Sequence, residues 1–120
     1  MEFGIALATS TDSWKVVKRA EELGFTHAWF YDTQLLCADV YAVMALAAQV
    51  TSKIKLATGV TIPSNRISAV TASAFGTLNH IAPGRIIFGV GTGFTGRRTM
   101  GMNAIKLKDM EDYVNEVYGL

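Results

Sequence analysis

Residues 86–98 read IIFGVGTGFTGRR, an apolar run that passes directly into a glycine-rich segment. The run Ile86–Val90 is short and rich in β-branched and aromatic residues, which predicts a buried strand. Pro83-Gly84 before it predicts a turn, and the glycines from Gly91 to Gly101 predict a loop after it. This stretch therefore predicts a strand whose carboxyl end meets a glycine-rich loop.

The chain before this strand repeats a pattern of short apolar runs followed by helical periodicity. We expect strands at Phe3–Ala8, His27–Tyr31 and Ile54–Thr61, and helices from Ser13 to about Leu23, at Asp39–Val50 and at Ser68–Ile81. A last helix is predicted to turn Leu107, Met110, Val114 and Val117 inward. The order of elements is thus βαβαβαβα.

Strict alternation of strands and helices predicts an α/β fold with a parallel sheet covered by helices. Four βα units make half of a TIM (β/α)8 barrel, and an open doubly wound sheet is the other architecture that this order allows. We expect residues 1–120 to form one half-barrel domain from a truncated or split barrel. Both architectures place ligands at the carboxyl ends of the strands.

Composition narrows the classes of partner. The formal charge is +1, with no basic stripe, so we expect no nucleic-acid partner. No apolar stretch approaches the roughly 18 residues of a membrane span, and no leader pattern opens the chain, so we expect a cytoplasmic protein. Cys37 stands alone, and the chain has no pattern typical of a metal site or of an acyl-transfer nucleophile.

The candidate site residues lie at the carboxyl ends of the predicted strands. Asp32 follows the second strand, Thr58–Thr61 ends the third, and Gly91-Thr92-Gly93 follows the fourth. Carboxyl ends of parallel strands meet at one rim of the sheet, so these residues should lie together. For Asp32, a local role as a helix cap or turn residue is the alternative.

Residues 91–96 match the dinucleotide-binding fingerprint GxGxxG. That fingerprint normally follows the first strand, whereas here it follows the fourth, so nicotinamide dinucleotide binding through Gly91, Gly93 and Gly96 is disfavoured. A loop that binds phosphate with the help of Arg97 and Arg98 is the favoured interpretation. A mobile loop with solvated arginines is the open alternative.

Three segments carry a family resemblance: RAEELGF at residues 19–25, ATGVT at 57–61 and GVGTGFTGRR at 89–98. In this order and spacing they resemble the bacterial luciferase-like superfamily, and within it the deazaflavin-dependent oxidoreductases, including methylenetetrahydromethanopterin reductase-like proteins. The resemblance covers the N-terminal half of a typical member. It implies a TIM barrel, coenzyme F420 or alternatively FMN at the carboxyl rim, and a non-prolyl cis peptide at Gly59–Val60.

The resemblance also implies a set of cofactor-binding residues, namely Asp32, Thr58, Gly59, Val60, Gly91, Thr92, Gly93, Arg97 and Arg98. The implied activity is hydride transfer between reduced F420, or FMN, and a small organic substrate. Sugar-phosphate dehydrogenases of the superfamily carry a histidine and a glutamate where this chain has Thr33 and Phe94, so no catalytic residue is named. The alternative is a non-catalytic half-barrel assembly module without cofactor.

A half barrel leaves two sheet edges unpaired, and unpaired edges invite another strand. We therefore expect either a homo-oligomer or a complementary half-barrel chain as partner.

Overall fold

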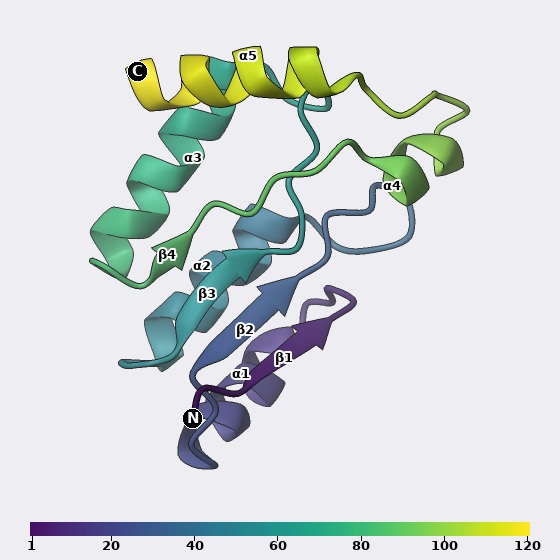
Figure 1. The fold of residues 1–120 in the computed structure, drawn as a ribbon. Coiled ribbons are helices and arrows are strands. Elements are labelled where there is room, and N and C mark those ends of the chain that lie inside the picture. The colour runs from purple at the N-terminus through teal and green to yellow at the C-terminus, as the bar shows by residue number, and fades with distance from the viewer.

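Four parallel strands form one sheet in the computed structural model, which describes residues 1–120 (Figure 1). The strands are β1 (Gly4–Leu7), β2 (His27–Phe30), β3 (Lys55–Thr58) and β4 (Ile86–Ile87). Their order in the sheet is the order in the chain, β1-β2-β3-β4. A doubly wound sheet reverses its strand order at a switch point, whereas a barrel does not. The chain is therefore half of a (β/α)8 barrel, and the doubly wound alternative is wrong.

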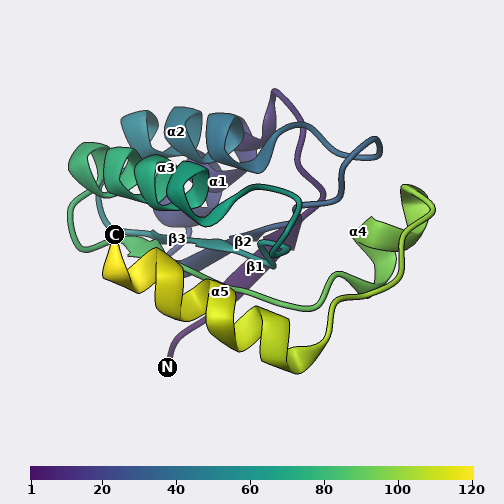
Figure 2. The ribbon, with the colours of Figure 1, turned by 90° about the horizontal axis from the view of Figure 1, so that it is seen from above.

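Five helices connect and flank the strands: α1 (Ser13–Glu22), α2 (Val40–Val50), α3 (Ser68–Ile81), α4 (Phe94–Thr99) and α5 (Leu107–Gly119). Helices α1, α2 and α3 lie on the same side of the sheet, and α5 packs against α3 (Figure 2). The predicted alternation is confirmed, with α4 added between β4 and α5. None of the helices has both the length and the apolar character needed to cross a membrane.

The strands are shorter than predicted, most clearly at β4. Regular pairing there covers only Ile86 and Ile87, although an isolated bridge joins Thr61 to Val90 further along. Between these points the N–H and C=O of Gly89 bond to the hydroxyl of Thr58 and to the backbone N–H of Thr61. A side-chain hydroxyl thus replaces part of the regular ladder, which interrupts the strand.

The glycine-rich segment was expected to be a loop throughout, and that prediction is wrong for residues 94–99. Gly93 has φ +78°, a left-handed conformation that suits glycine, and its carbonyl accepts the N–H of Arg97 to begin α4. Gly101, with φ +73°, follows the end of the helix. The glycines therefore bracket a short helix.

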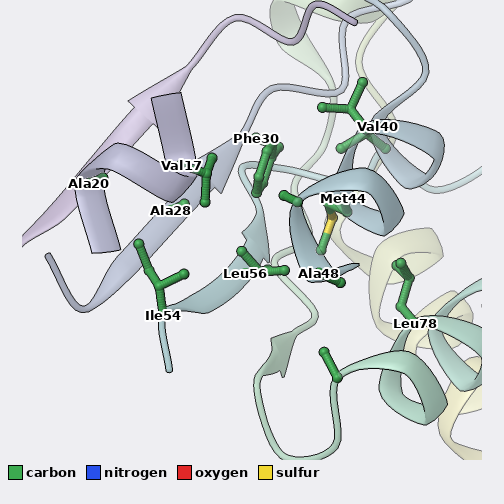
Figure 3. Close-up of a cluster of buried hydrophobic side chains, with 13 residues drawn as sticks. Val17, Ala20, Ala28, Phe30, Val40, Met44, Ala48, Ile54, Leu56 and Leu78 are labelled. Atoms are coloured by element: carbon green, nitrogen blue, oxygen red, sulfur yellow. The ribbon is translucent and has the colours of Figure 1, made fainter. Parts of the chain in front are cut away.

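Alternation along the strands separates two faces of the sheet. Ile5, Ala28, Leu56 and Ile86 form one row across the four strands, and this row faces the helices. The apolar sides of α1, α2 and α3 meet it in a cluster of 13 buried residues, which includes Val17, Phe30, Met44, Ile54 and Leu78 (Figure 3). This burial supplies the main stabilisation of the fold.

The opposite face of the sheet carries no helix over β1 and β2 (Figure 2). The next row across the strands is Ala6, Trp29, Ala57 and Ile87, which is mostly small. The Trp29 side chain lies so close to Gly59 and Gly89 that a Cβ on either would stand within 3.5 Å of it. The Trp29 ring is therefore the largest side chain of this row and lies beside the alanines of β1 and β3.

Tyr113 is the one buried residue of helix α5, and the periodicity did not single it out. Tyr113 is 8% exposed, its hydroxyl donates to the carbonyl of Arg66 (2.9 Å) and lies 2.5 Å from the Thr71 hydroxyl. Burial raises the pKa of the Tyr113 hydroxyl above its ordinary value. Met110, Val114 and Val117 are half-buried as predicted. Leu107 is 71% exposed, contrary to prediction, because it opens the helix and the packed stripe begins one turn later.

At the amino ends of the strands, Glu21 and Arg85 hold the connection from α2 to β3. The Glu21 carboxylate accepts the backbone N–H groups of residues 52–54, and Arg85 donates to the carbonyls of Ala48, Thr51 and Ile54. Burial alone would raise the pKa of Glu21, but these backbone donors hold it below the ordinary value. Glu21 and Arg85 therefore serve the fold, at the end of the sheet opposite to the carboxyl ends of the strands.

Candidate functional site

A cleft of about 440 Å³ opens at the carboxyl ends of the strands. Its lining comes from three successive loops: Tyr31, Asp32 and Thr33 after β2, Gly59, Val60 and Ile62 after β3, and residues 92–96 after β4. The volume lies within the roughly 300–1,000 Å³ typical of small-molecule sites. The predicted convergence of strand ends on one rim is confirmed.

The segment after β3 forms one side of this cleft. The Gly59–Val60 peptide is cis, as the resemblance implied, and both residues line the cleft. Thr58, just before them, is fully buried and does not line it. Its hydroxyl donates to the carbonyl of Gly89 (2.7 Å) and accepts the N–H of Gly89 (3.0 Å). Thr58 therefore joins β3 to the segment after β4, and its predicted contact with a cofactor stays a prediction.

The glycines after β4 permit close approach of backbone to the end of β3. A Cβ at Gly91 would stand 2.6 Å from Cγ2 of Val60, and one at Gly96 would stand 2.6 Å from Cδ1 of Ile62. Gly93 is buried against Ile62 as well, and it lines the cleft together with Thr92. Gly91 does not line the cleft, but it packs against Val60, which does. These glycines are used for packing, which is a further reason against the dinucleotide interpretation.

Asp32 is neither a helix cap nor a turn residue. Its side chain is 2% exposed and receives two hydrogen bonds from the guanidinium of Arg66, at 2.7 and 3.2 Å. Gln34 Nε2 donates to it as well, at 2.6 Å. The carboxylate lines the cleft, but its oxygens are occupied by these donors. Asp32 therefore binds the loop after β2 to Arg66 of the loop after β3 through a buried ion pair.

Arg66 is the residue of this rim that sequence reasoning missed. It also pairs with Asp39 at 2.8 Å, and its guanidinium lies 4.5 Å from the centre of the Tyr41 ring. Burial opposes its charge, but Asp32 and then Asp39 raise the pKa of Arg66 above the ordinary value. Burial alone would raise the pKa of Asp39, but the hydrogen bond from the N–H of Ala42 and the pairing with Arg66 hold that pKa below its ordinary value. The one feature of the sequence that could have indicated Arg66 is its place shortly after the third predicted strand, because the carboxyl end of that strand lies at the same rim as Asp32.

The two arginines proposed for phosphate binding lie in different surroundings. Arg97 is held by protein groups, since Nε donates to the carbonyl of Asn103 (2.5 Å) and Nη1 to Oγ of Ser64 (2.6 Å). Arg98 is exposed and stacks 4.9 Å from the ring centre of Phe94. Neither lines the cleft, so phosphate binding by Arg97 and Arg98 stays a prediction.

Thr33 and Phe94 both line this cleft, Thr33 on the loop after β2 and Phe94 on the segment after β4. They stand where the resemblance placed the acid and base of sugar-phosphate dehydrogenases. A hydroxyl and a 65% exposed aromatic ring supply no comparable proton transfer. The acid and base of those dehydrogenases are therefore absent at these two positions.

Comparisons with known proteins agree with this geometry. The sequence profile described as luciferase-like monooxygenase matches residues 6–118. A 5,10-methylenetetrahydromethanopterin reductase from Methanolobus tindarius is 43% identical over 96 residues, which are 78% of this chain and 29% of the reductase. An F420-dependent glucose-6-phosphate dehydrogenase from Intrasporangium calvum is 40% identical over 83 residues, which are 62% of this chain and 25% of that enzyme.

Solved structures show the same architecture. The coenzyme F420-dependent tetrahydromethanopterin reductase from Methanopyrus kandleri superposes with a TM-score of 0.80 and 31% identity, over 98% of this chain and 38% of that one. The oxygenating constituent of a 3,6-diketocamphane monooxygenase from Pseudomonas putida, solved with FMN, has a TM-score of 0.77. It covers 99% of this chain and 38% of that one, and its 21% identity shows the fold alone.

The chain thus spans less than two fifths of the length of these relatives, yet nearly all of it matches the family profile. The βα order, the cleft at the carboxyl ends of the strands and the match to the family profile all indicate the same family. The chain belongs to the luciferase-like monooxygenase family.

Proposed function

We propose that the rim cleft binds coenzyme F420, with FMN as the alternative, in an oxidoreductase that transfers hydride between this cofactor and a small organic substrate. The observation that carries the proposal is the cleft of about 440 Å³ at the carboxyl ends of the strands, which Gly59, Gly93 and Gly96 help to line. The F420 dependence named for two relatives supports the same cofactor.

The residues present fit such a group. Val60 and Ile62 offer apolar contact, and Thr92 and Thr95 add polar residues to the lining. When bound, the cofactor supplies the hydride, and the protein's part is to bind, orient and exclude water. The oxygens of Asp32 already accept bonds from Arg66 and Gln34, so Asp32 is assigned no proton transfer.

Titration with F420, followed by its fluorescence, tests the proposal, and a parallel titration with FMN decides between the two cofactors. Gly93→Val is expected to weaken binding about 10- to 100-fold, because Gly93 lines the cleft and the valine side chain would displace Ile62, which also lines it. The new side chain would collide with Ile62 and with the Arg97 stem. Gly119→Val is the control, since nothing lies within 4 Å of a Cβ at Gly119. Unchanged affinity in Gly93→Val contradicts the proposed site.

The alternatives predict other results in the same titrations. A non-catalytic assembly module binds neither F420 nor FMN. A dinucleotide site binds NADPH instead, and loses it in Gly93→Val. The cytoplasmic location expected from the sequence stays a prediction.

The same proposal includes a partner, for which we favour a second copy of this chain. Strands β1 and β4 each have only one neighbour, so both sheet edges are unpaired. Apolar grooves flank both edges: one of about 630 Å³ between α3, β4 and α5, and one of about 420 Å³ between β1 and α1. In a dimer in which β1 of each copy pairs with β4 of the other copy, both grooves would be covered.

Light scattering is expected to give twice the mass of the 120-residue chain. Charged substitutions in the two grooves, Val16→Asp and Ala72→Asp, are expected to shift the protein toward the monomer, because each buries a charge in an apolar contact. A well-folded monomer at high protein concentration contradicts the pairing.

A further inference from the structure

Two of the three loops that line the cleft are far apart in sequence. Residues 31–33, after β2, form one wall, and residues 92–96, where α4 begins, form another. Their backbones come near each other at Gly96, where a Cβ would stand 3.4 Å from the carbonyl oxygen of Asp32. The width of the cleft therefore depends on what holds α4 against the end of β2.

A chain of hydrogen bonds, here named the rim relay, joins the loops that carry these two walls. Nη1 of Arg97 donates to Oδ1 of Asn65 at 3.4 Å, and Nδ2 of Asn65 donates to Oε1 of Gln34 at 2.7 Å. Nε2 of Gln34 then donates to Oδ1 of Asp32 at 2.6 Å. The rim relay thus crosses the loops after β2, β3 and β4, and neither Gln34 nor Asn65 lines the cleft.

Charges at its two ends set the direction of the rim relay. Arg97 can only donate, so Asn65 must present its oxygen to it, and the ionised Asp32 can only accept, so Gln34 must present its nitrogen. The middle bond between the two amides then has a matched donor and acceptor. Hydrogen bonds aligned in one direction polarise one another, and both amides are half-buried, where water competes less.

Loss of either amide leaves the ends of the rim relay anchored. Arg66 still pairs with Asp32, while Ser64 and Asn103 still hold Arg97. We therefore expect the chain to stay folded without the relay, while α4 keeps only the long bond from Oγ1 of Thr99 to the carbonyl of Gln34 (3.5 Å) as a side-chain link to the loop after β2. This separates positioning of the cleft wall from stability of the fold.

We propose that Gln34 and Asn65 are positioning residues that set the spacing of the two cleft walls, and through it the affinity for the cofactor. The effect on affinity rests on the proposed function, whereas the effect on wall spacing does not. Both residues act through Asp32 and α4 without touching the ligand.

Backbone hydrogen exchange in the cofactor-free protein tests the wall spacing. Gln34→Met and Asn65→Leu remove the amides at similar side-chain size. Exchange of the N–H groups of Arg97, Met100 and Gly101, which bond within and just after α4, is expected to quicken about five- to tenfold, with the strands unchanged.

Gln49→Met and Asn115→Leu are the matched controls, because these amides are exposed on α2 and α5. Exchange in α4 that is the same in the relay variants and in the controls overturns the positioning role.

Titration with F420 tests the consequence for affinity. Each relay variant is expected to bind about five- to tenfold more weakly than the unsubstituted protein, and the double variant no more weakly than either single one, because both remove the same link. Equal affinity in the relay variants and the controls overturns the link to cofactor binding. If the unsubstituted protein binds neither F420 nor FMN, the proposed function is wrong, and the exchange result still decides the positioning role.

Discussion

Replacing Arg66 by methionine is expected to lower the free energy of unfolding by about 3–5 kcal/mol, the range seen when one partner of a buried ion pair is removed. The side chain of Asp32 is only 2% exposed, and Arg66 supplies two of its three hydrogen bonds. Without the guanidinium, a buried carboxylate keeps a single neutral donor. Urea unfolding followed by circular dichroism measures the loss.

Three further variants sharpen this test. Arg66→Lys keeps the charge but lacks the planar fork that bonds Asp32 twice, so an intermediate loss is expected. Asp32→Asn combined with Arg66→Met removes both charges and should recover most of the stability. Arg98→Met is the matched control on an exposed arginine, with an expected loss below about 1 kcal/mol. Equal losses in Arg66→Met and Arg98→Met would contradict the ion-pair argument.

Gly89→Ala is expected to cost about 3 kcal/mol or more, at the upper end for overpacking of a buried position. The added Cβ would overlap the backbone carbonyl of Thr58, which β3 holds in place. Relief requires movement of one strand end against the other, with loss of the bonds between the Thr58 hydroxyl and Gly89. The unfolding midpoint in urea reports the change.

Gly76→Ala is the control for that substitution. Gly76 lies within α3, and nothing is within 4 Å of a Cβ there. Alanine in an open helical position should raise stability by about 0.5–1 kcal/mol. A Gly89→Ala protein as stable as the unsubstituted chain would show that the close approach of β3 and the segment after β4 is not required.

Local pattern was enough to predict the architecture of the fold. The apolar runs and helical periodicities lie within single elements, so they predicted the βα order, the parallel sheet and the inward faces of α5 at Met110, Val114 and Val117. Helix α4 was missed because three glycines within residues 91–96 disfavour a helix by propensity, while the left-handed Gly93 and packing against Ile62 make one possible.

The candidate site was predicted only in part. Asp32, Gly59, Val60, Thr92 and Gly93 were placed at the rim because strand ends converge in any parallel sheet, and all five line the cleft. What each side chain does there depends on partners from other loops, and no periodicity carries that information.

Burial patterns are local, so the residue pattern is enough to predict which segments become strands and helices, and thereby which loops lie at the carboxyl rim. The pairing of Arg66 with Asp32 and the bond from Asn65 to Gln34 depend on contacts between distant segments, which the pattern does not contain. These contacts join residues 34 and 31 positions apart. They exist because the register of neighbouring strands brings the loop ends together, and a charge or amide buried there must find a partner.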